Sequence, residues 1–262
     1  MNSEDINLQN TELRHGKYDT RSKEYILKMI KEAIVLAGGL GTRLREVIKD
    51  VPKPMADING KPFLEYVLRL LDKQSIEKVV LSVGYRYEFI MDYFGDKFSN
   101  IRLIYSIEDE PLGTGGAIKK AIRLIDEDEI FIFNGDTFFQ VDLFKFYEFH
   151  SSKTSRLSIA LKMVNRTDRY GIVKIDKNNR ITAFLEKKEK QDGLINGGIY
   201  LMNKDFFLSF NLPDKFSFEQ DFLEKYYKDY EFYGFPFDSY FIDIGVPEDY
   251  DKAKYQWNQI VF

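Results

Sequence analysis

The sequence of 262 residues contains no cysteine, only two histidines (His15 and His150) and no long apolar run. Without thiols the chain cannot form a disulfide framework, a thiolate zinc site, an iron–sulfur cluster or a cysteine nucleophile. With so few imidazoles, hydrolysis by a Ser-His-Asp triad is also disfavoured. The apolar runs, such as 33–37 and 130–133, are far shorter than the roughly 18 residues of a membrane span. We therefore expect no membrane segment.

An excess of basic charge is missing as well. The 38 Lys and Arg residues against 42 Asp and Glu residues give a formal net charge of −4. Such a chain has no overall positive field for nucleic acid, so we expect no nucleic-acid partner. Residues 1–20 are polar and lack the apolar core of a secretion signal. The sequence therefore predicts a soluble, cytoplasmic protein.

Residues 1–21 have almost no hydrophobic periodicity. We predict that residues 1–31 form a loose arm ending in a short helix over 24–30, where four apolar side chains share one helical face. Beyond this arm, short apolar strands alternate with amphipathic helices, which indicates a mostly parallel sheet covered on both faces. The strands are expected at 33–37, 78–83, 101–106 and 129–134, and the helices at 62–74, 86–97, 115–125 and 142–150.

The second half has shorter strands. Beyond about residue 155 they are separated by turn residues such as those at 176–179, which favours mixed or antiparallel pairing. We predict an α/β fold with a single domain over 32–262, whose halves, about 32–150 and 151–262, share one sheet around one cleft. The expected strands of this half are 157–163, 171–175, 181–185, 195–201, 231–235 and 240–243, with helices at 217–228 and from Pro247.

A glycine-rich loop follows the first predicted strand. Gly38, Gly39 and Gly41 fall within four positions, which lets backbone N–H groups surround an anion, and Arg43 adds a fork of donors suited to phosphate oxygens. The loop is not a Walker A loop, because no Gly-Lys-Ser/Thr ends it. It is not a dinucleotide fingerprint either, because Leu44 takes the place of the third glycine. The alternatives are a phosphate cradle, which we favour, and a plain strand-to-helix turn.

Pro52-Lys53-Pro54 follows this loop, and its two prolines restrict the backbone around the lysine and so aim its charge. On its own the motif could equally be a solvated loop. Together, the segment 38–44 and this motif resemble the opening of the sugar-1-phosphate nucleotidylyltransferases, and the resemblance extends over about 33–255. The most similar branch is the D-glycero-D-manno-heptose 1-phosphate guanylyltransferases. The resemblance implies a Rossmann-like domain that joins a nucleoside triphosphate to a sugar 1-phosphate and releases pyrophosphate.

The resemblance implies that residues 32–150 form the nucleotide half, with the nucleobase on segment 106–116, whose glycines would admit a flat ring. Glu108 points to guanine, because a carboxylate can accept both the N1–H and the 2-amino donors of that base, whereas uracil or thymine would present acceptors to it. The alternative is a solvated acidic loop. The predicted nucleotide contacts are Leu36, Ala37, Gly38, Gly39, Gly41, Thr42, Arg43, Glu108, Gly113 and Thr114.

Two aspartates follow predicted strands. Asp136 comes after an apolar strand, where the crevice of an open α/β sheet binds ligands, and Asp243 comes after an aromatic strand. A carboxylate in such a crevice suits Mg²⁺, which takes few protein oxygens and adds substrate phosphates. Either aspartate alone could be a turn or helix-cap residue. The resemblance assigns both to the metal and implies Mg²⁺ as the cofactor.

The second half supplies the sugar side in this family. Glu186 would accept hydrogen bonds from sugar hydroxyls, while Lys187 would neutralise the 1-phosphate. The alternative is that residues 186–190 form a solvated, charged turn. The sugar-phosphate contacts implied by the resemblance are Tyr170, Gly171, Glu186, Lys187, Asn196 and Gly197.

The implied reaction needs no protein nucleophile, in agreement with the missing cysteines. Its candidate catalytic residues are Arg43, Lys53 and Asp136, which would neutralise and align two polyanions. Three alternatives stay open: a mannose- or glucose-1-phosphate enzyme of the same fold that uses another base, a non-catalytic nucleotide-binding regulatory module, and an unrelated transferase that consumes nucleotide sugars. The sequence also leaves open a homo-oligomer.

Overall fold

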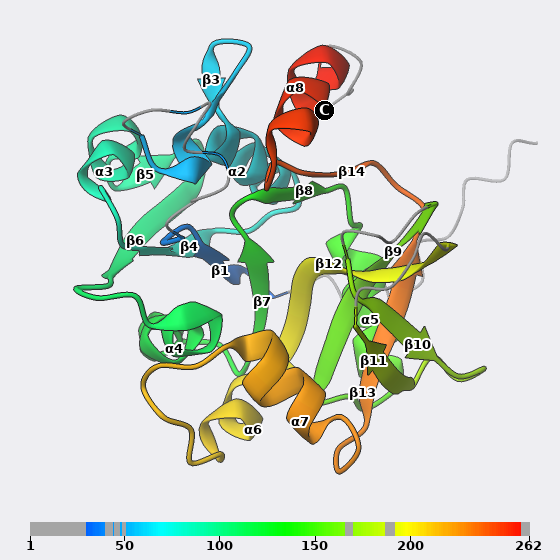
Figure 1. Cartoon of the computed structure of the whole chain (residues 1–262). Helices are drawn as coiled ribbons and strands as arrows, with labels where there is room; N and C mark the ends of the chain where they lie inside the picture. Colours follow the sequence, from blue (N-terminus) through cyan, green and yellow to red (C-terminus); the bar gives the residue numbers. More distant parts are fainter. Residues whose placement is uncertain are drawn as a thin grey trace, which may run out of the picture.

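The computed structural model describes residues 30–39, 44, 48, 51–165, 170–186 and 192–257. This part of the chain is built around a ten-stranded sheet with helices on both faces (Figure 1). The predicted α/β class is therefore confirmed. Within the described ranges, no helix combines the length and the apolar character that a membrane crossing requires. The predicted helix over 24–30 lies outside the described residues except for Ile30.

Four parallel strands form the centre of the sheet: β1 (Glu32–Leu36), β4 (Lys78–Val83), β6 (Ile101–Ile107) and β7 (Glu129–Asn134). β1 pairs with both β4 and β7, and β4 pairs with β6. Successive residues of one strand enter different cores, as Ile34 and Val35 do on opposite faces of the sheet. The strands are continuous apolar runs because both of their faces are buried.

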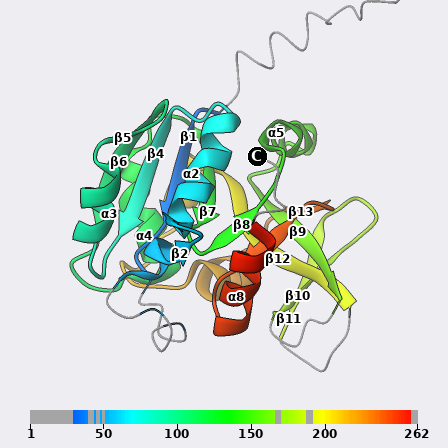
Figure 2. The same cartoon turned by 90° about the horizontal axis from the view of Figure 1, so that it is seen from above.

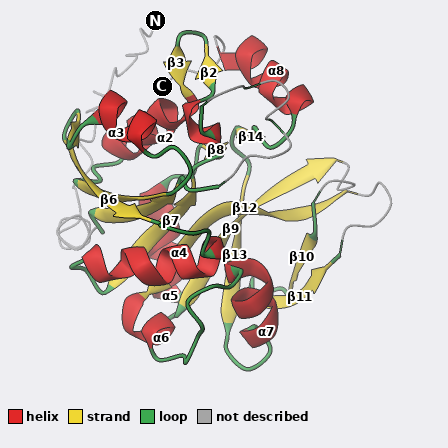
Figure 3. Cartoon of the chain, turned by 60° about the vertical axis from the view of Figure 1, so that its left-hand side comes forward, coloured by secondary structure: helices red, strands yellow, loops and turns green. Residues whose placement is uncertain are grey.

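The helices divide between the two faces (Figures 2 and 3). α2 (Phe63–Lys73), α3 (Glu88–Phe94) and α5 (Leu143–Ser152) contribute side chains to one core. α4 (Gly113–Ala121) and the 3₁₀ turn η2 (Ile122–Leu124) pack in the other core. The parallel centre is therefore covered on both faces, as predicted.

The predicted helix over 86–97 is too long. α3 ends at Phe94, because Gly95 adopts a φ of 60° and donates its N–H to Met91 O at 2.9 Å. Glycine in this conformation ends helices. The chain then forms β5 (Lys97–Phe98), which pairs with β6 in antiparallel fashion.

The second half extends the same sheet. β12 (Asp192–Asn203) pairs with β7 in antiparallel fashion and so joins the two halves. The sheet order is β11-β10-β12-β7-β1-β4-β6-β5, with β9 beside β12 and β13 beside β9. The remaining strands of this half are β9 (Leu157–Asn165), β10 (Ile172–Ile175), β11 (Ile181–Leu185) and β13 (Phe232–Phe237).

The chain between β12 and β13 forms α6 (Lys204–Leu208), the π-helical segment η3 (Phe218–Leu223) and α7 (Glu224–Tyr226). The predicted single α-helix over 217–228 is therefore wrong in type, because its first turns are wider than those of an α-helix. η3 buries Phe218, Phe222 and Leu223 in the same core as α4. Single-turn π-helices are rare and occur frequently at functional sites.

Several short elements lie near the carboxyl ends of the parallel strands. They are the 3₁₀ turn η1 (Lys53–Met55), the β2–β3 ribbon (Asp57–Ile58 and Lys61–Pro62), the β8–β14 ribbon (Thr137–Phe139 and Phe241–Asp243) and α8 (Pro247–Gln256). In the β8–β14 ribbon, Asp243 is paired with Thr137. This pairing brings the end of the second half next to the end of β7.

Candidate active site

A cavity of about 450 Å³, which we call the first cavity, lies at the carboxyl ends of the parallel strands. Open α/β sheets bind ligands at this edge. Its floor includes the last residues of β1 and β7, and the start of α4 closes one side. Its lining residues are Leu36, Gly38, Gly39, Lys53, Pro54, Glu108, Pro111, Gly113, Thr114, Ala117, Asn134 and Asp136.

Most of the predicted nucleotide contacts that the structure describes line the first cavity. Ala37 does not, because its side chain is buried in the core, and its N–H donates to Ser82 O at 2.7 Å. Gly41, Thr42 and Arg43 lie outside the described residues. Leu36, Gly38, Gly39, Glu108, Gly113 and Thr114 surround the cavity together with Lys53 and Asp136.

Lys53 lies between the two predicted metal ligands. Its Nζ is 2.5 Å from Asp136 Oδ2 and 3.8 Å from Asp243 Oδ1. The lysine side chain is only 12% exposed, whereas those of Asp136 and Asp243 are 38% and 23% exposed. Both carboxylates therefore converge on one buried cation at the edge of the first cavity.

Backbone contacts hold the two aspartates in place. The N–H of Ile244 donates to Asp136 O at 3.0 Å, and the N–H of Gly245 donates to Asp243 Oδ1 at 2.6 Å. Thr137 Oγ1 donates to Asp136 Oδ1 at 3.3 Å. The β8–β14 ribbon thus fixes two residues that are more than a hundred positions apart in the chain.

The two carboxylates fit the predicted Mg²⁺ site. They offer hard oxygen donors that meet at one point, and Mg²⁺ typically takes one or two carboxylates together with water and substrate phosphates. Within the described ranges, no group of three or more His, Cys, Asp or Glu side chains could hold a metal ion. Asp136 and Asp243 would thus be two carboxylate ligands of such an ion, which usually adds water and substrate oxygens.

Glu108 is fixed by two donors. Ser82 Oγ donates to its Oε1 at 3.2 Å, and the N–H of Leu112 donates to its Oε2 at 3.1 Å. Gly38 allows this carboxylate to approach, because a Cβ at that position would lie 2.7 Å from Glu108 Oε1. Since a carboxylate offers about four acceptor positions, each oxygen keeps one for a ligand.

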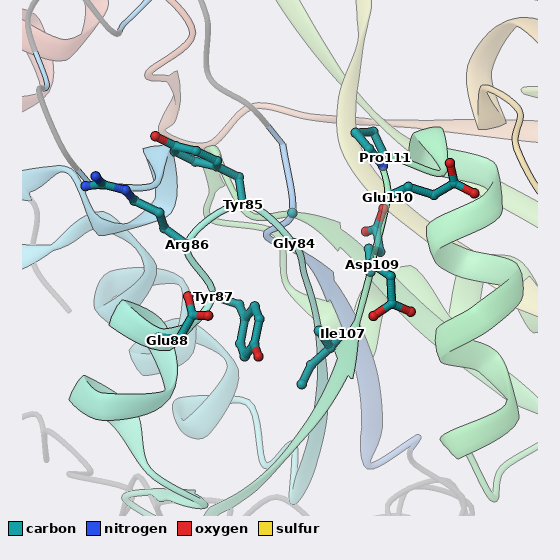
Figure 4. Close-up of a pocket in the computed structure, with 11 residues that line it drawn as sticks. Gly84, Tyr85, Arg86, Tyr87, Glu88, Ile107, Asp109, Glu110 and Pro111 are labelled. Carbon is teal, nitrogen blue, oxygen red and sulfur yellow. The ribbon is translucent and has the colours of Figure 1, made fainter.

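A side cavity of about 440 Å³ lies next to the first cavity, and Figure 4 shows the residues that line this side cavity. One wall is formed by residues 84–88, from the end of β4 to the start of α3. The other wall is formed by residues 107–111, which begin with the last residue of β6. Gly38 and Glu108 line both cavities. The Glu108 carboxylate therefore stands at the boundary between them.

The glycines of segment 113–116 pack against protein. A Cβ on Gly115 would lie 2.1 Å from the Phe216 ring, and a Cβ on Gly116 would lie 2.1 Å from Asp214 O. Only Gly113 also lines the first cavity. The expectation that these glycines admit a nucleobase is therefore wrong for Gly115 and Gly116, which admit a segment of the second half.

A second cavity, of about 550 Å³, lies between β10, β11, β12 and η3. Asn134 lines both the first and the second cavity, and its buried Oδ1 has no hydrogen-bond partner among the described residues. The two cavities therefore meet at the end of β7. The second cavity is lined by Asn134, Gly171, Ile172, Val173, Phe184, Leu185, Glu186, Asn196, Ser217, Glu219, Gln220, Leu223 and Glu224.

Three of the predicted sugar contacts, Gly171, Glu186 and Asn196, line the second cavity. Tyr170 is not among its lining residues and instead packs edge-on against Phe241, with ring centroids 6.3 Å apart. Gly197 is buried beside the Phe139 ring, where a Cβ would lie at 2.6 Å. Lys187 lies outside the described residues.

η3 and α7 also contribute to the second cavity, which no sequence motif predicted. Glu219, Gln220 and Glu224 line the second cavity opposite Glu186. Burial raises the pKa of Glu224, and the nearby charges of Glu186 and Glu219 raise it further. The local sequence carries no signal for this, because acidic side chains on a predicted helix are usually solvated.

The chain is similar to several known proteins. Residues 32–259 match the nucleotidyl transferase family. The D-glycero-alpha-D-manno-heptose 1-phosphate guanylyltransferase of Aneurinibacillus thermoaerophilus is 54% identical over 85% of this chain and 96% of its own. The enzyme of the same description from Campylobacter jejuni is 53% identical over 84% of this chain and 96% of its own.

A solved structure, HddC from Yersinia pseudotuberculosis complexed with GMP-PN, is 42% identical and superposes with a TM-score of 0.78. The match covers 87% of this chain and all of that one. Sequence and fold thus lead to one conclusion: the chain belongs to the nucleotidyl transferase family.

Proposed function

We propose that the protein transfers a guanylyl group from GTP to D-glycero-α-D-manno-heptose 1-phosphate and releases pyrophosphate. The observation that carries this proposal is the meeting of two cavities at Asn134, next to Lys53 and the two aspartates. Two relatives more than half identical to this chain are described as enzymes for that sugar phosphate. GTP would bind in the first cavity and the heptose in the second.

Glu108 supports guanine as the base. One acceptor position on each of its oxygens remains after the bonds from Ser82 and Leu112. The N1–H and the 2-amino group of guanine are adjacent donors that can fill both positions. Uracil and thymine have one ring N–H flanked by carbonyl oxygens, so they would bring an acceptor against the carboxylate.

In the proposed reaction an oxygen of the heptose 1-phosphate attacks the α-phosphorus of GTP. The bond from that phosphorus to the bridging oxygen breaks in line, and pyrophosphate leaves. The barrier comes mainly from bringing two polyanions together, so positive charge and alignment provide the catalysis. Lys53 supplies charge at the junction of the cavities, and Arg43 in the glycine-rich loop is the second cation proposed for the triphosphate.

We infer that Asp136 and Asp243 hold Mg²⁺ when nucleotide is bound. The ion would neutralise charge on the phosphates of the bound nucleotide. Lys53 would then exchange its carboxylate contacts for contacts with phosphate oxygens. The two aspartates therefore keep Lys53 at the reaction centre before substrate arrives.

The polar wall of the second cavity suits a sugar with many hydroxyl groups. Glu186 provides acceptors for hydroxyl donors, and the amide side chain of Asn196 lines the same cavity. Lys187, which follows Glu186, is the proposed partner of the sugar phosphate. Apolar Ile172, Val173 and Phe184 line the same cavity and would contact the C–H faces of the sugar.

The proposed function is tested by a grid of four nucleoside triphosphates against manno-heptose, mannose and glucose 1-phosphates, read by pyrophosphate release with Mg²⁺. We expect the highest kcat/KM for GTP with the heptose 1-phosphate, and weaker turnover with mannose 1-phosphate. A site that bonds an additional hydroxyl discriminates strongly against an analogue that lacks it. A higher kcat/KM for another pair would overturn the proposal, and so would the absence of pyrophosphate release with every pair.

A further inference from the structure

A segment of the second half crosses onto the nucleotide side of the molecule. Phe216 O accepts the N–H groups of Gly115 at 3.0 Å and Gly116 at 3.4 Å, and the N–H of Phe216 donates to Leu112 O at 3.0 Å. The glycines of α4 allow this approach, as their Cβ contacts show. The start of α4, which lines the first cavity, is therefore attached to the chain that leads into η3.

Glu219, on η3, accepts hydrogen bonds from three side chains, two of which lie on other elements. Thr114 Oγ1 donates to its Oε2 at 2.6 Å, Ser217 Oγ donates to the same oxygen at 3.2 Å, and Tyr200 Oη donates to its Oε1 at 3.2 Å. Thr114 Oγ1 also accepts the N–H of Phe218 at 2.9 Å, so its hydroxyl proton points to Glu219. The carboxylate thus joins the start of α4 to β12.

The network continues to the sugar side. Tyr200 is fully buried, and its hydroxyl accepts a hydrogen bond from Asn196 Nδ2 at 2.9 Å. Asn196 Oδ1 accepts the N–H of Gly198 at 2.9 Å, which fixes the orientation of the amide. Burial raises the pKa of Tyr200, and the charge of Glu219 raises it further, so the hydroxyl stays protonated and donates.

Thr114 lines only the first of the two cavities, and Asn196 lines only the second. We propose that Glu219 is a positioning residue that couples the two substrate pockets through the series Thr114, Glu219, Tyr200 and Asn196. This inference rests on the proposed function for the identity of the ligands. A carboxylate suits the role, because it accepts from Thr114 and Tyr200 at once, whereas a glutamine side chain would turn one of these acceptors into a donor.

The test is a double-mutant cycle read by the KM for heptose 1-phosphate at saturating GTP. Thr114→Val removes a hydroxyl that does not line the sugar cavity, so a structural role confined to the nucleotide pocket would leave this KM unchanged. Loss of one hydrogen bond in the network is expected to raise it about three- to tenfold. Glu219→Ala is expected to raise it by at least as much, and Thr114→Val added to Glu219→Ala is expected to have no further effect.

Three further variants sharpen the test. Thr114→Ser keeps the hydroxyl and should restore the KM to within about twofold of the wild type. Tyr200→Phe removes the hydroxyl that donates to Glu219 and accepts from Asn196. It should raise the KM for heptose 1-phosphate about three- to tenfold, and it replaces Glu219→Ala in the cycle if that variant does not fold. Asp229→Asn removes a charge from an exposed position that follows α7, and it should leave both kcat and KM unchanged.

Additive effects of Thr114→Val and Glu219→Ala would overturn the proposal, as would an unchanged sugar KM in Thr114→Val. The same comparison can be made by calorimetric titration of heptose 1-phosphate into protein loaded with a GTP analogue whose α–β bridge cannot be cleaved. If this titration shows the predicted pattern while GTP yields no pyrophosphate, the proposed function fails and the coupling stands. If turnover is normal and the cycle is additive, only the coupling fails.

Discussion

Asp136 carries a charge that the proposed reaction needs, and replacing this charge should have little effect on folding. Its side chain is 38% exposed and bonded to Lys53. Asp243 Oδ1 lies 3.8 Å from the same ammonium group, so the buried lysine keeps an anionic neighbour when Asp136 is neutralised. We expect Asp136→Asn to lower kcat by about 100- to 1000-fold while the protein stays folded. Pyrophosphate release at saturating Mg²⁺, together with circular dichroism, checks both parts, and near-wild-type turnover would contradict the assignment.

Glu108 decides base selectivity in the proposed site. Glu108→Gln replaces one acceptor by a donor, so one donor of guanine loses its partner. The expected cost is about 1 to 3 kcal/mol, or roughly a tenfold to hundredfold lower kcat/KM for GTP.

Asp109→Asn is the matched control for Glu108→Gln, because the Asp109 side chain is 95% exposed and its ion pair with Lys120 is long, at 3.7 Å. It should leave kcat/KM for GTP unchanged. Unaltered use of GTP by folded Glu108→Gln would mean that the base is recognised elsewhere.

At the level of single residues, the local motifs around Lys53, Asp136 and Asp243 were each ambiguous, and the family resemblance singled these residues out. The structure brings the three side chains into one ion-pair cluster. Gly115 and Gly116 were misinterpreted, because their partner at 214–216 is about a hundred positions away. Glu219 was missed for the same reason, since its bond to Thr114 spans 105 positions and no local motif marks it.

The glycines of α4 are explained by close packing against segment 214–216, and a substitution tests this explanation. An alanine in an exposed helix is usually more stable than a glycine by up to about 1 kcal/mol. In Gly116→Ala the new Cβ would lie 2.1 Å from Asp214 O, so we expect the free energy of unfolding to fall by about 1 to 3 kcal/mol.

Urea denaturation measures this difference. Gly39→Ala is a suitable control for stability, because a Cβ there would have no atom within 4 Å, and the change should stay within about 0.5 kcal/mol. A stabilised Gly116→Ala would show that segment 214–216 does not dock as described.

On α2, the buried carboxylate of Glu65 should contribute to the stability of the fold. Burial alone would raise the pKa of Glu65, but hydrogen bonds from Arg69, Tyr93 and Lys61 outweigh it, and the pKa lies below its usual 4.5. Tyr93 Oη is 2.8 Å from Glu65 Oε2, so the bond also joins α3 to α2. Because folding favours the charged form, the stabilisation is complete above the unfolded pKa and is lost as the pH falls through the folded one.

We therefore expect Glu65→Gln to lower the free energy of unfolding by about 1 to 3 kcal/mol at neutral pH. The difference from the wild type should shrink as the pH falls below 4.5. Denaturant titrations over this range provide the measurement, and a difference that is independent of pH would contradict the role of the charge.

At the level of elements, periodicity predicted the parallel centre well, because strands buried on both faces are continuous apolar runs. The errors have separate causes. Gly95 is a local signal for the end of α3 that outweighs the helical pattern beyond it. The π-helical form of η3 depends on packing against α4 and is not encoded in the apolar spacing of 217–228.

On the scale of the whole molecule, one sheet carries both cavities, because β12 pairs directly with β7. The junction at Asn134 therefore belongs to a continuous hydrogen-bonded framework. In the described residues, the segment around Phe216 gives the two halves a second connection through α4. This architecture holds two separate ligand sites at a fixed relation, as a reaction between two bound substrates requires.

The measurement that tests this assignment of the cavities most directly is a crystal structure of the protein with GDP-D-glycero-α-D-manno-heptose. We predict guanine against the Glu108 carboxylate in the first cavity, the diphosphate beside Lys53, and the heptose in the second cavity next to Glu186 and Asn196. Two results would contradict this assignment: guanine in the cavity between segments 84–88 and 107–111, or a heptose outside the second cavity.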